Sequence, residues 1–297
     1  MKLKNNILKT CITLLIVVCH LSAQGKKADL VIFSYNRPIQ LYALLESTEN
    51  YVEGLQETHV IYRATQDKYE AAYQEVQKTF PFVLFHKQGK DPRKDFKPLT
   101  LQAAFNSPSD YILFAVDDDI VKDFIDIENS IELLEQTNAY GFYFRLGLNL
   151  NRCYPLNKSQ KVPPAQQVVD DVYMWHFNSG QHDWNYPNTV DMTLYKKSDI
   201  KYILTKIPFY APNSLEGTWA RYYNKEKRFG LCHEQSKIVN LPINKVQQEC
   251  QNRTMNALGA QKLLELFTQG LKINIIPLFR VKNKAAHMDH VPTFIER

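Results

Sequence analysis

A run of six apolar residues that ends in three consecutive aspartates is the feature that most constrains this chain. Residues 111–116 read Tyr-Ile-Leu-Phe-Ala-Val and follow the turn-forming segment 106–110, Asn-Ser-Pro-Ser-Asp. A short apolar run without polar alternation is typical of a strand covered on both faces, as in a parallel sheet. The acids Asp117, Asp118 and Asp119 then follow a buried strand. There they repel one another unless a cation binds.

Two of these carboxylates suit a hard divalent cation. Ligands of open α/β sheets bind at the carboxyl ends of the strands, and Mg²⁺ and Mn²⁺ prefer oxygen ligands. We therefore expect Asp117 and Asp119 to hold such an ion and to leave positions for phosphate. The alternative is a solvated turn, in which one aspartate caps a helix that starts near Ile120 and the others face water.

A second apolar strand with a polar end occurs near the N-terminus. Residues 28–33 are mostly apolar, and Pro38, a few residues later, suits the first turn of a helix. A strand, a polar loop and a helix in this order form an edge suited to a nucleotide. The polar residues of the loop are Ser34, Tyr35, Asn36 and Arg37.

Together the two segments resemble the GT-A class of glycosyltransferases. The matching residues are 31–38, Val-Ile-Phe-Ser-Tyr-Asn-Arg-Pro, and 114–119, Phe-Ala-Val-Asp-Asp-Asp, about 80 residues apart. In that class the first strand meets the nucleotide and an Asp-x-Asp motif holds the metal. The resemblance covers residues 28–200 well and is looser beyond them. It implies a family 2-like enzyme with a nucleotide-sugar donor, Mn²⁺ or Mg²⁺ as cofactor, and Asp118 beside the donor.

Strands and helices alternate along the first part of the chain. Strands are expected at residues 59–63 and 82–85, with helices over 68–78 and 99–105. This alternation predicts an α/β, mostly parallel, right-handed wound sheet flanked by helices, which is Rossmann-like. We expect one domain over residues 28–297, with the nucleotide-binding half at 28–125 and the acceptor-binding half at 140–297. Further strands are expected at 141–145, 172–177, 189–195 and 273–279, and a further helix at 257–267.

Two more polar residues are candidates for binding the donor. Asp67 follows the second expected strand and would bind the base or ribose, or else it caps a helix. Lys97, in a charged segment, would neutralise the diphosphate, although a solvated loop explains it equally well. No GxGxxG or GxxxxGK[ST] motif follows the first strand, which argues against a dinucleotide site or a P-loop.

The acceptor side is expected to carry aromatic residues and one acid. Trp175, Trp184 and Tyr186 would stack on sugar faces, or else they belong to the core. Asp191 is expected inside the strand at 189–195, where a carboxylate needs a partner or a ligand. It would contact acceptor hydroxyl groups, or it lies exposed at a sheet edge.

Glu216 is the candidate catalytic base. Direct displacement at the anomeric carbon needs a carboxylate that faces the donor. The position of Glu216 is similar to that of the acid that inverting GT-A enzymes place after the acceptor segment, although Gly217 follows here instead of Asp. The alternative is a helix start, with Ser214 as cap and Glu216 as favourable first-turn charge.

A histidine near the C-terminus is a candidate metal ligand. Many GT-A enzymes add such a histidine to the metal shell, which makes His287 or His290 a partner for Asp119. We prefer His287, and His233 is a weaker competitor.

The N-terminus carries an export signal or a short anchor. Residues 1–23 combine three lysines, a short apolar run and a small-residue exit. The apolar run is shorter than the roughly 20 residues that span a bilayer. A cleaved signal would place the protein in the secretory pathway, the periplasm or outside the cell, and an uncleaved one would associate it with a membrane. Removing the three lysines lowers the formal charge from +5 to +2, so there is no electrostatic argument for nucleic acid.

These features predict a metal-dependent glycosyltransferase that moves a sugar from a nucleoside diphosphate sugar to a hydroxyl group of a glycan, lipid or protein, with inversion. The alternatives are a retaining transferase, a nucleotidyltransferase on the same fold, or a secreted carbohydrate-binding protein without turnover. Three cysteines remain after the leader, without CxxC spacing, so at most one disulfide is expected.

Overall fold

A nine-stranded sheet passes through both halves of the chain. The computed structural model describes residues 25–222, 226–246, 253–255 and 258–297. The strands of the sheet are β1 (Ala28–Tyr35), β3 (Leu55–Arg63), β4 (Leu84–Lys87), β5 (Tyr111–Val116), β8 (Gly141–Gly147), β11 (Ala165–Val169), β12 (Val172–His176), β13 (Thr193–Lys196) and β14 (Phe229–His233). Their spatial order is β11-β12-β14-β8-β13-β5-β1-β3-β4.

Most strands of this sheet point in the same direction. β5, β1, β3 and β4 are joined in parallel, and so are β8 and β14. β13 is antiparallel to both β5 and β8, and β12 is antiparallel to its neighbours β11 and β14. The predicted α/β class with a mostly parallel sheet is therefore confirmed, with β12 and β13 as the two reversed strands.

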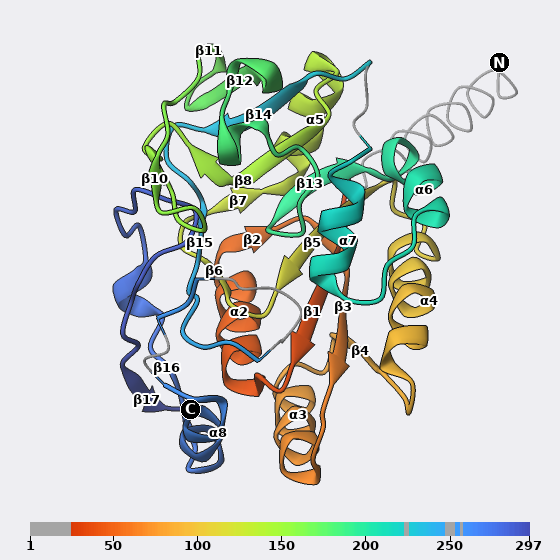
Figure 1. Ribbon diagram of the computed structural model, residues 1–297, viewed down its shortest axis with the longest axis vertical. Helices are drawn as coiled ribbons and strands as arrows, with labels where there is room; N and C mark the ends of the chain where they lie inside the picture. The colour runs from red at the N-terminus through yellow and green to blue at the C-terminus, as the bar shows by residue number, and fades with distance from the viewer. Residues whose placement is uncertain (1–24, 223–225, 247–252, 256–257) are drawn as a thin grey trace, which may run out of the picture.

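Helices cover both faces of the sheet (Figure 1). Side chains of α2, α3, α5 and α8 belong to the hydrophobic core on one face, and those of α4, α6 and α7 belong to the core on the other. The helices are α2 (Pro38–Tyr51), α3 (Asp67–Thr79), α4 (Pro92–Phe105), α5 (Ile127–Thr137), α6 (Lys197–Lys206), α7 (Pro212–Trp219) and α8 (Ala260–Thr268).

The central strands are buried on both faces, as the apolar runs predicted. In β1, Leu30 and Ile32 belong to one core while Val31 and Phe33 belong to the other. Successive side chains of a strand point to opposite faces, so a strand covered on both sides needs apolar residues throughout.

The chain also forms short strands and 3-10 helices outside the nine-stranded sheet. The short strands are β2 (Val52–Glu53), β6 (Asp119–Val121), β7 (Ile125–Asp126), β9 (Arg152–Cys153), β10 (Lys158–Ser159), β15 (Ile238–Asn240), β16 (Leu271–Ile273) and β17 (Phe294–Glu296). The 3-10 helices are η1 (Phe177–Ser179), η2 (His182–Asn185) and η3 (Ile276–Leu278). β6 pairs with β15, so no helix starts near Ile120, and the alternative in which an aspartate caps such a helix is wrong.

Two other expected elements are also corrected. The strand expected at 189–195 begins only at Thr193, so Asp191 lies in a bend before β13 and not inside a strand. The strand expected at 273–279 is divided between β16 and η3, because Pro277 has no backbone N–H for a strand ladder.

The leader and the cysteines were also assigned expected roles from the sequence. The expected signal or anchor at residues 1–23 lies outside the described residues. Within the part of the chain that the structure describes, no helix has the length and apolar character needed to cross a membrane. Cys153 and Cys232 are buried free thiols, and Cys250 is outside the described residues.

Candidate active site

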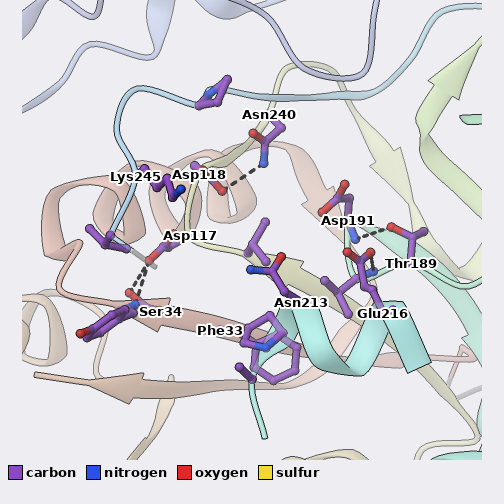
Figure 2. Close-up of a pocket in the computed structure, with 18 of the residues that line it drawn as sticks. Phe33, Ser34, Asp117, Asp118, Thr189, Asp191, Asn213, Glu216, Asn240 and Lys245 are labelled. Carbon is purple, nitrogen blue, oxygen red and sulfur yellow. Dashed lines mark hydrogen bonds between the residues drawn. The ribbon is translucent and has the colours of Figure 1, made fainter. Parts of the chain in front are cut away.

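A cavity of about 1180 Å³ opens at the carboxyl ends of β1, β3 and β5. This volume exceeds the roughly 300–1000 Å³ of most small-molecule sites. Strand ends contribute one wall, and α7 with the bend before β13 contributes the opposite wall (Figure 2). The cavity therefore has room for two ligands that meet between the walls.

The first wall is organised around Asp117. Its Oδ2 accepts hydrogen bonds from the Ser34 hydroxyl at 2.9 Å and from the Tyr35 backbone N–H at 3.1 Å. Ser34 Oγ also lies 2.6 Å from the Tyr73 hydroxyl on α3. Burial raises the pKa of Asp117 to about 6, against the opposing charge of Arg37. The ends of β1 and β5 are thus joined through Ser34 and Tyr35, expected to bind the donor, and Asp117, expected to bind the metal.

Arg37 holds two of the three aspartates. Its Nη1 donates to Asp117 Oδ1 and to Asp118 Oδ2, both at 2.9 Å. Its Nη2 donates to the backbone carbonyl of Asn244. The Arg37 side chain is only 11% exposed. A cation of the chain itself therefore occupies the acidic edge.

The third aspartate points away from the cavity. Asp119 is fully buried, and its carboxylate accepts from Val116 N at 3.1 Å and from Asn240 Nδ2 at 3.0 Å. The same Asn240 amide donates to Asp118 Oδ1, and Asp118 does line the cavity. The pKa of Asp119 is raised well above its ordinary value by burial and then by Asp191.

Of the predicted ligand set, Asp117 and His287 line the cavity and Asp119 does not. In the described residues, no group of three or more His, Cys, Asp or Glu side chains is placed to hold a metal ion. Asp119 is used to bind backbone and amide N–H groups at the turn between β5 and β6. Asp118, the remaining acid of the triplet, lines the cavity together with Asp117 and His287.

His287 reaches the cavity from the C-terminal segment. Its backbone forms a bridge with Asn240, and its ring is stacked on Tyr154 with centroids 5.7 Å apart. Its Nδ1 is buried without a hydrogen-bond partner among the described residues. Of the other two histidines considered, neither His290 nor His233 lines the cavity, and His233 bonds Asp171 instead.

Glu216 projects from α7 into the opposite wall. Its Oε1 accepts the backbone N–H of Val190 at 2.8 Å, which fixes the carboxylate between α7 and the bend before β13. Burial, and then the nearby charge of Asp191, raise the pKa of Glu216 to about 7. The pKa of Asp191 is itself raised by burial, with His287 and Arg145 opposing the shift.

The helix start is formed by another residue. Ser214 Oγ accepts from the backbone N–H groups of Tyr210 and Ala211, so the first turn of α7 is closed without Glu216. The carboxylate of Glu216 therefore remains available to the cavity.

Three expected donor residues lie outside the cavity lining. The Asn36 side chain bonds Thr65 and ties the loop after β1 to the loop after β3. Asp67 is the exposed first residue of α3, where Gln66 is the N-cap. Lys97 Nζ donates to the carbonyls of Thr205 and Ile207 at the end of α6. Ser34, Tyr35, Arg37 and Asp118 do line it.

The tryptophans expected to stack on sugars are core residues. Trp175 and Trp184 are at most 1% exposed, and Trp175 Nε1 donates to the Trp184 carbonyl at 2.9 Å. The ring of Trp175 on β12 packs edge to face with that of Trp184 on η2, with centroids 5.1 Å apart, and both rings are buried. Tyr186 lines the cavity, close to the Arg145 guanidinium.

Four residues that shape the site were not predicted from the sequence. Asn240 and Asn244 come from the segment after β14, Tyr73 from α3, and Arg145 from β8. Arg145 is 2% exposed and bonds Asp183 at 3.4 Å, which brings a cation near Asp191 and Glu216. A buried Arg inside an apolar strand is the one signal that was available, since such a charge needs partners.

Fold and cavity together define an α/β protein with an acidic site at the carboxyl edge of its sheet and a carboxylate of raised pKa opposite. The chain is similar to a curated protein described as bifunctional glycosyltransferase pgtA from Dictyostelium discoideum. The two are 25% identical over 256 residues, which cover 75% of this chain and 33% of the relative. The chain thus spans about a third of the length of the relative that it matches. The predicted resemblance to glycosyltransferases is confirmed by this match. No family model matches the chain.

Solved structures show weaker similarity. A mannosyltransferase from Pyrobaculum calidifontis, in complex with GDP-Man and Mn²⁺, has a TM-score of 0.40 at 11% identity, over 70% of this chain and 55% of that one. TarS from S. aureus with UDP-GlcNAc has a TM-score of 0.41 at 13% identity, over 82% and 66%. A UDP-glucose pyrophosphorylase with UDP-glucose has a TM-score of 0.38 at 10% identity, over 82% and 98%. All three scores lie below 0.5 and establish neither donor nor reaction.

Proposed function

We propose that this chain is a glycosyltransferase that moves a sugar from a nucleoside diphosphate sugar to a hydroxyl acceptor, with inversion. The observation that carries the proposal is the cavity with two different walls. One wall is formed by Ser34, Asp117 and Asp118 at the ends of β1 and β5. The opposite wall presents Glu216. The similarity to a curated glycosyltransferase supports the same reaction class.

Glu216 is proposed as the general base. A carboxylate with a pKa of about 7 is ionised in part at neutral pH and accepts a proton more readily than an ordinary glutamate. In the reaction, the acceptor hydroxyl oxygen forms a bond to the anomeric carbon and gives its proton to Glu216. The bond from that carbon to the diphosphate oxygen breaks, and the diphosphate leaves with the electron pair.

Asp118 and His287 are proposed to hold Mn²⁺ or Mg²⁺. Both line the cavity, and the unpartnered Nδ1 of His287 is a nitrogen ligand in need of a partner. Two protein ligands leave room in the coordination sphere for diphosphate oxygens and water. Such an ion, when bound, stabilises the negative charge of the leaving diphosphate.

The donor and the acceptor are assigned to opposite sides of the cavity. Ser34, Tyr35 and Arg37 form the proposed nucleotide side. Tyr186 and Arg145 form the proposed acceptor side, and Asp191 lies close enough to Arg145 and His287 for their charges to act on its pKa. The acceptor is a hydroxyl group of a glycan, lipid or protein. The compartment of the protein depends on its leader. We propose that the protein is secreted when the leader is cleaved and attached to a membrane when it is not.

Nucleotide binding tests this proposal. Isothermal calorimetry with the full chain compares UDP, GDP and CMP, each with and without Mn²⁺, and repeats the series with Asp118→Ala. We expect one diphosphate to bind more tightly with Mn²⁺ and this gain to disappear in the variant. If none of the nucleotides binds under either condition, the donor assignment is wrong.

A second measurement separates the alternatives. Slow hydrolysis of the donor sugar is expected from a transferase, whereas a carbohydrate-binding protein releases no nucleoside diphosphate. A retaining transferase would give the opposite anomer of the product, which proton NMR resolves. A nucleotidyltransferase would release pyrophosphate from a nucleoside triphosphate and a sugar phosphate.

A further inference from the structure

Without any ligand, the positive charge of Arg37 neutralises the acidic edge formed by Asp117 and Asp118. Its single Nη1 group donates to Asp117 and Asp118 at 2.9 Å each, and both carboxylates are nearly buried, with 5% and 13% of each side chain exposed. Charge-assisted bonds of this length are among the strongest polar contacts in proteins. The two acids are therefore stabilised by a guanidinium before any ligand arrives.

This arrangement restricts where a divalent cation can bind. Asp118 Oδ2 is bonded to Arg37, and Asp118 Oδ1 is bonded to Asn240 Nδ2. A metal ion on Asp118 must either displace one of these donors or lie beside a guanidinium of the same charge sign. Like charges a few ångströms apart in a site with little water repel each other strongly.

A diphosphate relieves this restriction. A guanidinium binds phosphate oxygens in the same two-pronged way as it binds carboxylates. Arg37 lies at the N-cap position of α2, and its side chain lines the cavity. Movement of the guanidinium from Asp118 to a phosphate would free Oδ2 and at the same time neutralise the incoming ligand.

We propose that Arg37 is an internal counter-ion that competes with the divalent cation for Asp118, so that the metal binds tightly only together with the donor diphosphate. The inference rests on the proposed function for the identity of the second ligand. It goes beyond that function because it assigns a coupling between the two ligands and a role to a residue that is not a metal ligand. Coupling of this kind is reciprocal, so the metal raises nucleotide affinity by the same factor.

The test is Mn²⁺ binding to the full chain, followed by the electron paramagnetic resonance signal of free Mn²⁺. Three conditions are compared: Mn²⁺ alone, Mn²⁺ with UDP and Mn²⁺ with GDP, each corrected for Mn²⁺ bound by the nucleotide in solution. We expect the diphosphate that binds to raise the Mn²⁺ affinity of the wild-type chain by about tenfold or more. We expect Arg37→Gln to bind Mn²⁺ alone about tenfold more tightly than the wild type and to lose most of this coupling.

Matched variants separate the contact from overall charge. Arg93→Gln removes the same charge from the cavity wall, where the Arg93 guanidinium lies over the Tyr210 ring, and should leave Mn²⁺ affinity unchanged. Arg37→Lys keeps the positive charge but lacks the paired N–H groups of the guanidinium. Its Mn²⁺ affinity should lie between those of the wild type and Arg37→Gln. Thermal unfolding shows whether each variant is folded. Should Arg37→Gln not fold, the wild-type coupling and the lysine variant still decide the question.

Two results would overturn the inference while the proposed function stands: a nucleotide that binds the wild type with no effect on Mn²⁺ affinity, or Arg37→Gln with wild-type affinity for Mn²⁺ alone. If no nucleotide binds any form of the protein, the proposed function fails instead. The Mn²⁺ affinities of Arg37→Gln and Arg93→Gln still test the competition in that case.

Discussion

At the scale of single residues, the site depends on acids whose charges are held close together. Asp117, Asp191 and Glu216 all have pKa values raised first by burial. Arg37 and Arg145 are the cations that oppose these shifts. Groups with such perturbed pKa values gather at functional sites, because binding and proton transfer need charge that is not fully compensated.

Glu216→Gln should strongly slow transfer and leave donor binding intact. The amide oxygen of glutamine can still accept the Val190 N–H, so the geometry of α7 is preserved, but an amide cannot take a proton from the acceptor. We expect a loss of about 10²–10⁴-fold in kcat, measured with the nucleotide sugar that binds. A variant with near-normal kcat would remove Glu216 from the mechanism.

The pH profile of the wild type provides an independent check. Because the base must be ionised, kcat/KM should rise with pH through about 7, the pKa of Glu216. Asp191→Asn removes a like charge and therefore lowers that pKa, so the acidic limb should move to lower pH. A limb that stays in place, or moves to higher pH, would show that Asp191 does not act on the base.

At the scale of elements, a buried ion pair fixes β1 to the start of α6. Lys197 Nζ lies 2.6 Å from Asp29 Oδ2, and the two side chains are 9% and 0% exposed. Ser107 also donates to Asp29, so the carboxylate lies within a network of three segments. β1 carries Ser34 at its other end, so this anchor supports the nucleotide wall of the cavity.

Lys197→Met should destabilise the protein by about 3–5 kcal/mol, because it leaves the Asp29 charge buried without its cation. Urea unfolding measures the change. Lys94→Met is the matched control, since Lys94 pairs with Asp91 at the surface and is 84% exposed. Asp29→Asn combined with Lys197→Met should regain part of the loss, whereas equal losses in the single and double variants would contradict the explanation.

Substitution by alanine at two glycines should have opposite effects on the stability of the protein. A Cβ on Gly230 of β14 would lie 2.6 Å from the Trp175 ring and 2.8 Å from the Tyr143 ring, while none of the described atoms lies within 4 Å of a Cβ on Gly217 of α7. Gly230→Ala should cost about 1–3 kcal/mol through overpacking. Gly217→Ala should stabilise the protein by up to about 1 kcal/mol, because alanine favours the helix. Thermal unfolding at one pH measures both, and a common sign would refute the packing argument.

At the scale of the whole molecule, the cavity joins segments that are far apart in the chain. Asp117 follows β5, Asp191 precedes β13, and Glu216 lies on α7. Strand order brings them together, because β13 lies next to β5 in the sheet. The folded chain therefore gathers acids that are well separated when it is unfolded.

This gathering makes stability depend on pH in a defined direction. The pKa of Glu216 is about 7 in the folded protein, above its ordinary value of 4.5, so the folded state binds a proton that the unfolded state has released. Stability from this group is present below about pH 4.5 and is lost as pH rises to about 7. Glu216→Gln does not titrate, so its unfolding temperature relative to wild type should rise between pH 5 and pH 8.

Scanning fluorimetry at several pH values measures this difference. The comparison with the variant cancels other groups, such as the partly buried His233, whose lowered pKa acts in the opposite direction. Glu75→Gln is a control, because Glu75 is exposed and pairs with Lys78 at the surface. A difference that falls with pH would show that Glu216 has no raised pKa.

The sequence by itself determined the fold class and the position of the acidic edge. The apolar runs of β1 and β5 and the polar residues after them are local patterns, and in a parallel sheet the carboxyl ends of such strands meet at one edge. That is why the common location of Ser34, Arg37 and Asp117 at this edge, where all three line the cavity, follows from local patterns without any knowledge of distant contacts. The helical spacing of α3 and α8 is local in the same sense.

Tertiary structure alone decided which side chains face the cavity. Asp118 and Asp119 are neighbours with the same chemistry, yet Asn240, more than a hundred residues later, binds both and only Asp118 lines the cavity. Trp175 and Trp184 are buried in a core that they share with Tyr143 and other residues distant in the chain. The orientation of a side chain depends on partners that are remote in sequence, and no local pattern encodes them.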